Sequence, residues 1–443
     1  MEDTASLLSF KNINRLAVPA LLTGIAEPIL SATDAAVVGN IDLNATEALA
    51  AVGIVGSFLS ALIWVLGQTR SALQAIIAQY LGADKLEEID ELPAQAIYFN
   101  LILAVIILGS TLFFIEGIFS LYNAEGLILD YCVQYYGIRV WGFPLTLFTF
   151  AVFGIFRGLQ NTFWPMVVAI IGASLNIALD FLLVYGIADV IEPQGLEGAA
   201  YASLIAQAVM ALLSLILVLK KTEISLRLKF PLNKELYNLV GMALNLFLRT
   251  IALNVALYLA NAFATDYGAS YIAAQTILIN IWLFSAFFID GYAAAGNILA
   301  GRLLGKNDRA GLWKLGKIIT AYALGVSLIL MLVGILFYKP LGLIFSKEPE
   351  VIARFTAIFF MVILMQPINA IAFVFDGIFK GMGKMKYLRN VLFAATAIGF
   401  VPAIFIADYY ELKLLSIWIA FLVWMIFRSV PLLVYYVKTF RPT

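Results

Sequence analysis

The stretch Gly154-Ile-Phe-Arg-Gly158 recurs 223 residues further along the chain as Gly377-Ile-Phe-Lys-Gly381. Three further matches keep the same offset: Pro144 with Pro367, Leu81-Gly82 with Leu304-Gly305, and Leu49-Ala-Ala51 with Ile272-Ala-Ala274. Any one of these matches is weak, but four in a single register indicate an internal repeat. The glycines at positions i and i+4 of the first pair also allow two helices to approach each other closely.

The composition excludes a water-soluble globular protein. Of the 443 residues 63% are hydrophobic and 13% are charged, whereas a typical soluble domain has about 25% charged residues. A net charge of zero provides no basic field for nucleic acid. The single cysteine, Cys132, rules out an internal disulfide, and the absence of histidine removes the commonest zinc ligand and leaves carboxylates for proton chemistry. A polytopic helical membrane protein remains.

Apolar stretches long enough to cross a hydrocarbon layer of about 30 Å recur along the whole chain. We expect twelve, at about residues 12–37, 48–80, 94–118, 130–157, 164–188, 196–220, 234–264, 271–301, 312–337, 351–380, 388–408 and 412–437. Six spans per repeat make both repeats enter the membrane from the same side. The predicted fold is an all-α membrane protein of twelve transmembrane helices in two parallel six-helix repeats. Its N-lobe is residues 1–222, its inter-lobe linker 223–233 and its C-lobe 234–443.

The basic residues predict the orientation of these spans. With both termini in the cytoplasm, 20 of the 28 lysines and arginines lie in cytoplasmic segments, 4 lie on the opposite side and 4 lie within spans. Such an excess is the usual sign of the cytoplasmic face. Both termini and the linker are therefore expected to be cytoplasmic.

Two acidic residues inside spans distinguish the first repeat from the second. At the offset of 223, Asp34 aligns with Leu257 and Asp180 aligns with Ala403. The repeated fold therefore does not itself require these acids. A carboxylate near the membrane centre costs at least about 2.5–3.5 kcal/mol, and it is usually buried in protein or faces a polar cavity. We expect Asp34 and Asp180 to have a function that belongs to the N-lobe.

Other polar residues accompany these two acids. Asn176 precedes Asp180 by one helical turn, Glu27 precedes Asp34 by two turns, and Ser203 lies one turn into the sixth span. If the acids converge, they can form a proton-titrating pair, or they can form a sodium site with the amide and hydroxyl oxygens. The structural alternative is a hydrogen-bonded carboxylate that fixes helix packing. Glu27 directly precedes Pro28, so it can equally lie beside a carbonyl exposed at a kink.

The second repeat carries its own charges within spans, namely Arg249, Asp290 and Asp376. We expect an ion pair of Arg249 with Asp290 or Asp376, because opposite charges inside one bundle usually pair. The alternative is a role for these residues in binding a substrate. The acidic run Asp84–Glu91 is expected to be solvated surface.

Missing motifs narrow the class further. The chain has no phosphate-binding G-x-x-x-x-G-K-[ST], no G-x-S-x-G hydrolase motif, no T-V-G-Y-G selectivity filter and no arginine-rich voltage-sensing span. Without a nucleophile–base pair an intramembrane enzyme is disfavoured, and a passive channel would not need an acid pair in one lobe. Secondary transport is the class that remains.

Several motifs resemble the multidrug and toxic compound extrusion (MATE) family. They are Ala32-Thr-Asp34-Ala-Ala-Val-Val-Gly39, Arg157-Gly-Leu-Gln-Asn-Thr-Phe-Trp-Pro-Met166 and Asn176-x-x-x-Asp180 in the first half. In the second half Arg249-Thr250, Asp290-Gly-Tyr-Ala-Ala and Phe375-Asp-Gly-Ile-Phe-Lys-Gly381 are similar to its DinF-like branch.

The resemblance implies a V-shaped bundle in an inner (plasma) membrane, which exports amphipathic, often cationic compounds against an inward proton or sodium flow. It implies that Asp34 is the coupling residue and that Asn176 and Asp180 are its partners, with Ser203 near a threonine of relatives. These residues would form a metal site only if the ion is sodium. Relatives outside this branch use acids in the seventh and tenth spans, where this chain has Arg249-Thr250 and Asn369.

The sequence therefore predicts a multidrug efflux antiporter that works by alternating access and is not an enzyme. Its expected partners are small amphipathic or cationic drugs and membrane lipid, and no nucleic acid partner is expected. We expect a monomer, and we expect no cofactor besides the coupling H⁺ or Na⁺. The candidates for lining a substrate cleft are Glu27, Arg249, Asp290, Asp376 and Asn369. The alternative function is a flippase for lipid-linked precursors, which would need a strongly cationic cavity.

Overall fold

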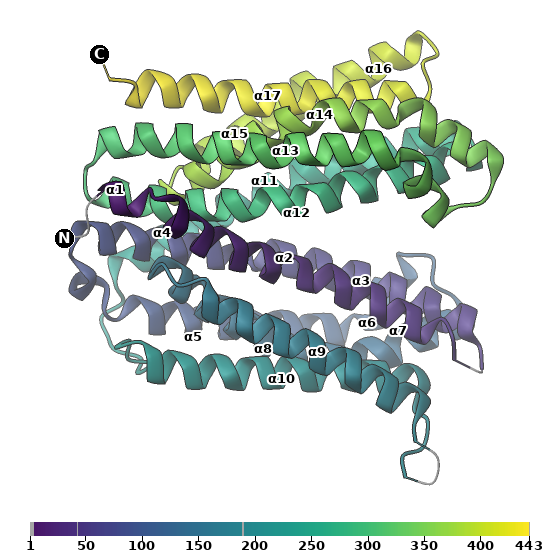
Figure 1. Cartoon of the computed structure of the whole chain (residues 1–443). Helices are drawn as coiled ribbons and strands as arrows, with labels where there is room; N and C mark the ends of the chain where they lie inside the picture. Colours follow the sequence, from purple (N-terminus) through teal and green to yellow (C-terminus); the bar gives the residue numbers. More distant parts are fainter. Residues whose placement is uncertain (1–3, 42, 188–189, 443) are drawn as a thin grey trace. The chain divides into compact units, whose positions relative to one another are not determined.

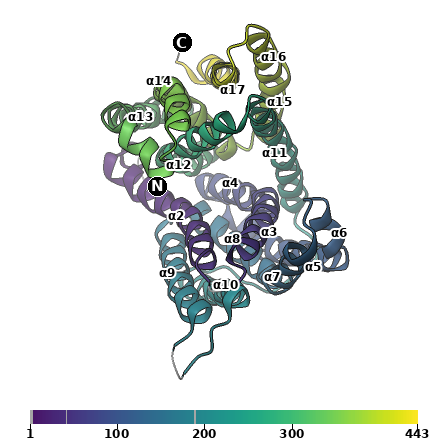
Figure 2. The same cartoon turned by 90° about the vertical axis from the view of Figure 1, so that its right-hand side faces the viewer.

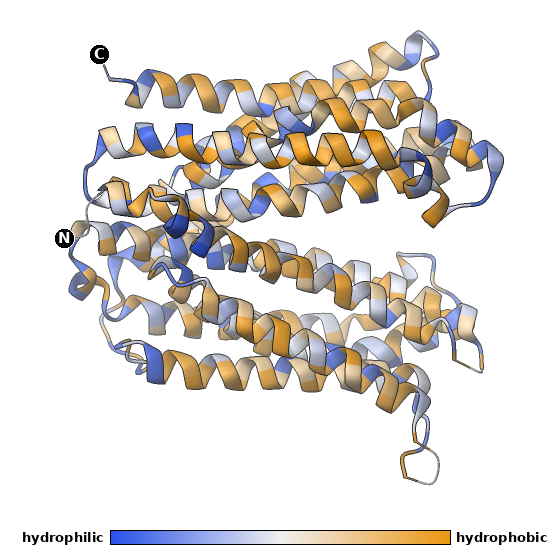
Figure 3. Ribbon diagram, viewed as in Figure 1, coloured by the Kyte–Doolittle hydropathy of each residue, from blue (hydrophilic) through white to orange (hydrophobic). Residues whose placement is uncertain are grey.

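The computed structural model describes residues 4–41, 43–187 and 190–442, without the side chain of Glu27, and these residues form an all-helical bundle (Figure 1). The helices are α1 Thr4–Leu7, α2 Phe10–Val38, α3 Ala45–Leu66, α4 Gln68–Ala83, η1 Leu86–Ile89, α5 Leu92–Phe113, α6 Ile115–Ser120, α7 Gly126–Arg139, α8 Gly142–Gly158, α9 Phe163–Tyr185, α10 Gly195–Lys221, α11 Lys234–Asp266, α12 Ala269–Gly305, α13 Arg309–Phe345, α14 Pro349–Gly381, α15 Met385–Ala394, η2 Ala395–Phe400, α16 Val401–Tyr409 and α17 Leu414–Phe440. Hydrophobic residues cover the helices along most of their length, and hydrophilic residues gather at helix ends and loops (Figure 3).

The twelve expected spans agree with these helices. Within the described residues, eleven helical segments are long and apolar enough to cross a membrane, and the pair α7–α8 supplies a twelfth if it crosses as one span. This pair bends by 47°. Pro144 lies in the first turn of α8, where its missing N–H is not needed, so the chain can begin a new helix there. Its repeat counterpart, Pro367, lies inside the unbroken α14.

The internal repeat is confirmed by two matching helix crossings. A Cβ at Gly154 would press on the carbonyl oxygen of Arg70, and a Cβ at Gly377 would press on that of Ala293. Arg70 and Ala293 are themselves 223 residues apart. Gly158 and Gly381 repeat the relation one turn later, against the carbonyls of residues 74 and 297. The two glycine pairs therefore bring α8 onto α4 and α14 onto α12 in the same way.

The chain divides into two compact units, whose bounds depart from the expected lobes in the first span, at Leu81–Asp84 and at the start of α11. Unit 1 contains the chain up to Leu21, Leu81–Asp84 and the chain from Met242 onward, whereas unit 2 contains Leu22–Tyr80 and Lys85–Gly241. The first half of α2 belongs to unit 1 because of its contacts there. Asn14 accepts a hydrogen bond from the Tyr292 hydroxyl at 2.9 Å. The helix α2 thus contributes residues to both units.

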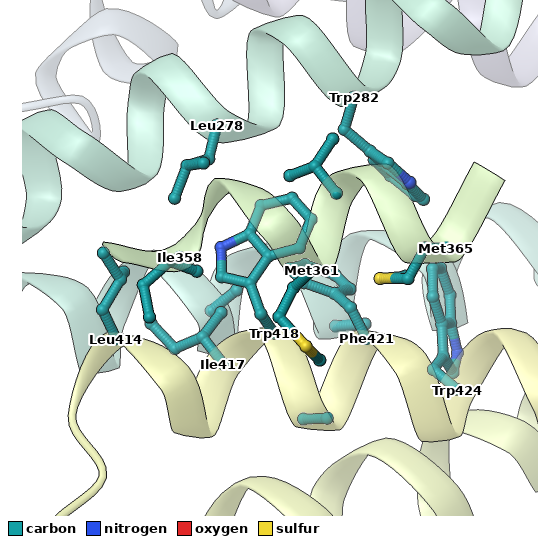
Figure 4. Packing of buried hydrophobic residues seen from close by; sticks show 14 of the residues in the cluster. Leu278, Trp282, Ile358, Met361, Met365, Leu414, Ile417, Trp418, Phe421 and Trp424 are labelled. Carbon is teal, nitrogen blue, oxygen red and sulfur yellow. The ribbon is translucent and has the colours of Figure 1, made fainter. Parts of the chain in front are cut away.

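A hydrophobic cluster of unit 1 that is rich in aromatic rings joins α12, α14 and α17 (Figure 4). Trp282 of α12 stacks on Phe421 of α17 with ring centroids 5.7 Å apart. The indole N–H of Trp418 donates to Gln275 at 2.9 Å and that of Trp424 donates to Thr396 at 3.0 Å, so the buried polar edges of both rings are satisfied. This cluster fixes the three helices that carry Asp290, Asp376 and Arg428.

In unit 2 the inter-lobe linker is held against the start of α5. The buried Gln95 side chain donates to the carbonyls of Lys229 at 3.0 Å and Pro231 at 3.4 Å, and it accepts from the Asn233 N–H at 2.8 Å. Lys229 also forms an exposed ion pair with Asp90 at 3.3 Å. Most acids of the acidic run are exposed as expected, but Asp90 and the Glu88 carbonyl, which accepts from Asn233 Nδ2 at 3.1 Å, help to hold the linker.

Candidate functional site

Unit 2 contains a buried cluster of two acids, an amide and a hydroxyl. Asp34 comes from α2, Asn176 and Asp180 from α9, and Ser203 from α10; their exposed fractions are 6%, 4%, 0% and 1%. The Asn176 Nδ2 donates to Asp180 Oδ2 at 2.7 Å and to Asp34 Oδ1 at 3.3 Å. The Ser203 Oγ donates to Asn176 Oδ1 at 3.3 Å or to Asp34 Oδ2 at 3.4 Å. The structure therefore brings together all four residues that the sequence grouped.

Small residues let α9 and α10 approach closely enough to form this cluster. The two helices lie side by side (Figures 1 and 2). A Cβ at Gly198 would overlap the carbonyl of Leu183, and one at Gly172 would overlap the side chain of Met210. The C-terminal end of α2 is tied to α9 by the Tyr185 hydroxyl, which donates to the Val37 carbonyl at 2.8 Å. These contacts hold Asp34 beside the Asn176–Asp180 turn.

The cluster has more acceptor than donor capacity. Asp180 Oδ1 is buried and accepts no hydrogen bond from the described residues, and Asp34 and Asp180 interact electrostatically with each other. Two like charges in a dry site are unfavourable unless a proton or a cation joins them. The arrangement is therefore chemically suited to take up one positive charge.

Oxygen ligands for a hard cation are present, although among the described residues no group of three or more acidic, cysteine or histidine side chains could hold a metal ion. Two carboxylates, an amide oxygen and a hydroxyl are ligands that suit sodium. In this structure the amide nitrogen of Asn176 faces both carboxylates and its oxygen faces Ser203. A sodium ion between the carboxylates would need this amide to turn so that the oxygen faces inward.

Two further residues near the acids were not singled out from the sequence as site residues. Arg139, the last residue of α7, interacts electrostatically with both Asp34 and Asp180. Its guanidinium lies over the ring of Tyr135, with 5.7 Å between the guanidinium carbon and the ring centroid, and Tyr135 is buried. The available signal was that Arg139 is one of only four basic residues within predicted spans. Its position at the α7–α8 bend was not readable from the sequence.

The charges of unit 1 form a separate network. Asp376 binds Arg249 Nη2 through Oδ1 at 2.5 Å and Lys380 Nζ through Oδ2 at 2.7 Å. The expected ion pair of Arg249 is therefore made with Asp376. Asp290 is exposed and interacts with these three charges at longer range. Arg428 packs over Trp424, with 4.8 Å from its guanidinium carbon to the ring centroid.

The two remaining cleft candidates have different outcomes. Asn369 lies in α14, is 1% exposed, and its Oδ1 has no hydrogen-bond partner among the described residues. The side chain of Glu27 lies outside the described part of the chain, so the prediction for it stays a prediction. Asn369 is therefore a buried candidate in unit 1 with unused hydrogen-bonding capacity.

Comparison with known proteins identifies the family. The MatE family profile matches residues 19–182 and 246–405, one segment in each repeat. The chain belongs to the MATE family. The chain is 23% identical to the DNA damage-inducible protein F of Escherichia coli over an alignment of 429 residues. This alignment covers 96% of this chain and 91% of the E. coli protein. The DinF-like resemblance is thereby supported, and MATE members are transporters rather than enzymes.

Two other matches extend this picture. The MATE-family chain is 28% identical to the protein DETOXIFICATION 43 of Arabidopsis thaliana, over 73% of this chain, and it spans 62% of the length of that plant protein. The solved structure of a MOP superfamily transporter from Pyrococcus furiosus matches all of this chain and all of its own with a TM-score of 0.89 at 20% identity, which shows the shared fold. The protein is thus a multi-pass membrane protein with the MATE fold.

Proposed function

We propose that this MATE-family chain is a secondary active antiporter that exports small amphipathic or cationic compounds in exchange for a cation. The observation that carries the proposal is the buried cluster of Asp34, Asn176, Asp180 and Ser203, in which two carboxylates share one site. The second repeat has Leu257 and Ala403 at the positions of the two acids. The repeated fold therefore does not require these acids, which supports reversible binding of a positive charge as their role.

The orientation of Asn176 supports the proton as the coupling ion. Its amide N–H groups donate to both carboxylates, an arrangement that stabilises the ionised acids before a proton arrives. Protonation of one acid removes a negative charge and creates an O–H donor. Asp180 Oδ1, which accepts no hydrogen bond from the described residues, can carry this proton itself or can accept a hydrogen bond from a protonated Asp34. Sodium requires the additional rotation of the amide described above.

The division of α2 between the two units supports coupling of ion binding to conformational change. Asp34 lies in the part of α2 that belongs to unit 2, whereas the part before Leu22 belongs to unit 1. A change of charge at Asp34 therefore acts on a helix whose residues belong partly to unit 1 and partly to unit 2. Alternating access follows if the cation binds one arrangement of this helix more tightly than the other, because only differential affinity shifts a conformational equilibrium.

The decisive experiment uses the purified full chain in liposomes with a fluorescent cationic dye and separately imposed pH and sodium gradients. We expect dye movement driven by the pH gradient alone. The variant Asp34→Asn keeps the side-chain shape and removes the charge, and we expect its dye movement to fall to that of protein-free liposomes. The matched control is Asp130→Asn, which removes an exposed carboxylate from the same unit.

Three outcomes would change the proposal. Movement that requires sodium would make Asp34, Asn176 and Asp180 a metal site. Normal efflux by Asp34→Asn would contradict coupling at this cluster. Absence of gradient-driven movement in every arm would favour the flippase.

We also propose that the protein is a monomer without a cofactor or nucleic-acid partner. We propose that it spans an inner membrane, with the helix ends that carry most basic residues on the cytoplasmic side. Orientation can be tested with a membrane-impermeant thiol reagent in a Cys132→Ser background. We expect Leu228→Cys in the linker to be protected in intact cells and Lys347→Cys at the opposite ends of the helices to react. The reverse pattern would overturn the orientation.

The charges of unit 1 do not favour the flippase. That function needs uncompensated cations for a pyrophosphate group, but Arg249 and Lys380 share Asp376 and a further acid, Asp290, lies nearby. Arg428 is buried against aromatic rings. The cations of this network are therefore largely neutralised or enclosed.

A further inference from the structure

A cavity of about 270 Å³ opens in unit 1 at the end of the helices where its basic residues gather. Its walls come from the end of α12, the start of α13, the end of α14, the residue before α15 and the end of α17. Polar residues are concentrated in the lining: Asn307, Arg309, Lys384 and Thr439. The cavity lies outside the cluster of unit 2 and outside the Arg249–Asp376 network.

The charge of this cavity is positive. Arg309 and Lys384 line it, no acidic residue does, and neither cation has an ion pair within the described part of the chain. The adjacent acid, Asp308, is already engaged, because it accepts a hydrogen bond from Thr4 Oγ1 at 2.7 Å and caps the Gly311 N–H at 2.7 Å. The two cations are therefore available to a negatively charged ligand.

Backbone dipoles add to this positive charge. The helix α15 begins at Met385, directly after Lys384, and has no side-chain cap, whereas the first turn of α13 is already capped by the Asp308 carboxylate. The N-terminal turn of a helix carries a partial positive charge and exposed N–H groups, and it favours anions. One uncapped helix N-terminus and two cationic side chains thus border the same cavity.

The remaining walls are apolar and fixed. Leu312 and Phe440 line the cavity and are buried. Tyr435 forms a further wall, and its ring packs against those of Phe379 and Tyr387 with centroids 5.3 and 4.9 Å away. These walls are at the ends of helices that are long and apolar enough to cross a membrane, so a lipid headgroup at the membrane surface can reach them. An anion that also carries apolar chains fits them better than a free ion.

The internal repeat shows that the fold does not require these cations. At the offset of 223 residues, Arg309 aligns with Leu86 and Lys384 aligns with Asn161. The position of Asn307 is taken by Asp84, an acid. The first repeat therefore builds the equivalent corner without either cation, and the positive cavity is specific to the second repeat.

We propose that this cavity binds the phosphate group of an anionic phospholipid, with Arg309 and Lys384 contacting the phosphate and the apolar walls contacting the glycerol and acyl carbons. Basic pockets between helices at a membrane surface are suited to such headgroups. The site is independent of the cation cluster, so it does not depend on the proposed coupling mechanism.

The test is a titration of the purified full chain in neutral detergent with phosphatidylglycerol, with bound lipid counted by native mass spectrometry. Each basic residue near an anionic lipid surface contributes about a fivefold change in affinity. We therefore expect Arg309→Gln/Lys384→Gln to weaken binding about 25-fold. The matched control is Lys386→Gln/Lys438→Gln, which removes two exposed lysines outside the cavity and should change affinity less than twofold.

Specific results would overturn the proposal. Equal losses in the two double variants would mean that binding reflects general charge, and equal binding of phosphatidylcholine would mean that the anionic headgroup is not recognised. Competition by inorganic phosphate at the same concentration as the lipid would assign the cavity to a free anion. The lipid-free thermal stability of both double variants is measured alongside, and we expect it to match that of the parent chain because all four side chains are exposed.

Discussion

Removing the charge of Asp376 should destabilise unit 1 by about 3–5 kcal/mol, the usual cost of breaking a buried ion pair on one side. Asp376 is 8% exposed, and its two oxygens lie 2.5 Å from Arg249 and 2.7 Å from Lys380. In Asp376→Asn the buried guanidinium of Arg249 keeps its charge and loses the carboxylate that it contacts, so only the longer-range interaction with Asp290 remains. Lys380→Gln should cost less than Asp376→Asn, because Asp376 keeps Arg249 as its partner and the Lys380 side chain, at 21% exposed, is less buried than that of Arg249, at 10%.

Replacing both partners should reverse most of this loss. In Arg249→Met/Asp376→Leu neither buried charge remains, and apolar replacements of buried ion pairs are often neutral or stabilising. Unfolding in detergent micelles can be followed by the fluorescence of the seven tryptophans, several of which lie in the core of this unit. A double-mutant cycle from the parent chain, the two single variants and the double variant gives the coupling energy directly.

Two results would refute the reasoning. A coupling energy below about 0.5 kcal/mol would mean that the ion pair does not stabilise the unit in the way that its burial implies. A double variant that is as stable as the parent chain but does not move dye would mean that these charges act in transport. If they only brace α11 against α14, the double variant transports normally.

Two further predictions concern packing. Gly381→Ala should lower the unfolding temperature by several degrees, because the added Cβ would overlap the carbonyl of Asn297. The control Gly325→Ala should be neutral or slightly stabilising, because its Cβ would meet nothing within 4 Å. Equal effects of the two substitutions would contradict the close crossing of α12 and α14. Gln95→Leu should leave backbone groups of the linker unpaired and speed trypsin cleavage of the linker. The control Gln68→Leu should not change cleavage, because the Gln68 amide donates to the nearby Trp64 carbonyl and not to the linker. Unchanged cleavage in Gln95→Leu would show that this side chain does not hold the linker.

Much of the fold and of the candidate site was predictable from the sequence. Apolar length gives the spans, because a helix must satisfy its backbone within the membrane on its own. The constant offset of 223 gives the repeat, and the acids without counterparts, Asp34 and Asp180, point to the N-lobe site. The spacing of Asn176 and Asp180 places both on one face of α9, and their hydrogen bond of 2.7 Å follows from that spacing.

The tertiary structure alone decided which helices face one another. Periodicity records the buried face of one helix, but the partner of that face depends on where the other helices cross it. For this reason the sequence left Arg249 with two possible partners, and the crossing of α11 and α14 selected Asp376. For the same reason Arg139 could be recognised as an intramembrane charge but not as a neighbour of the two acids. The sharing of α2 between the units also arises from contacts between distant residues, such as Asn14 with Tyr292, that no local pattern encodes.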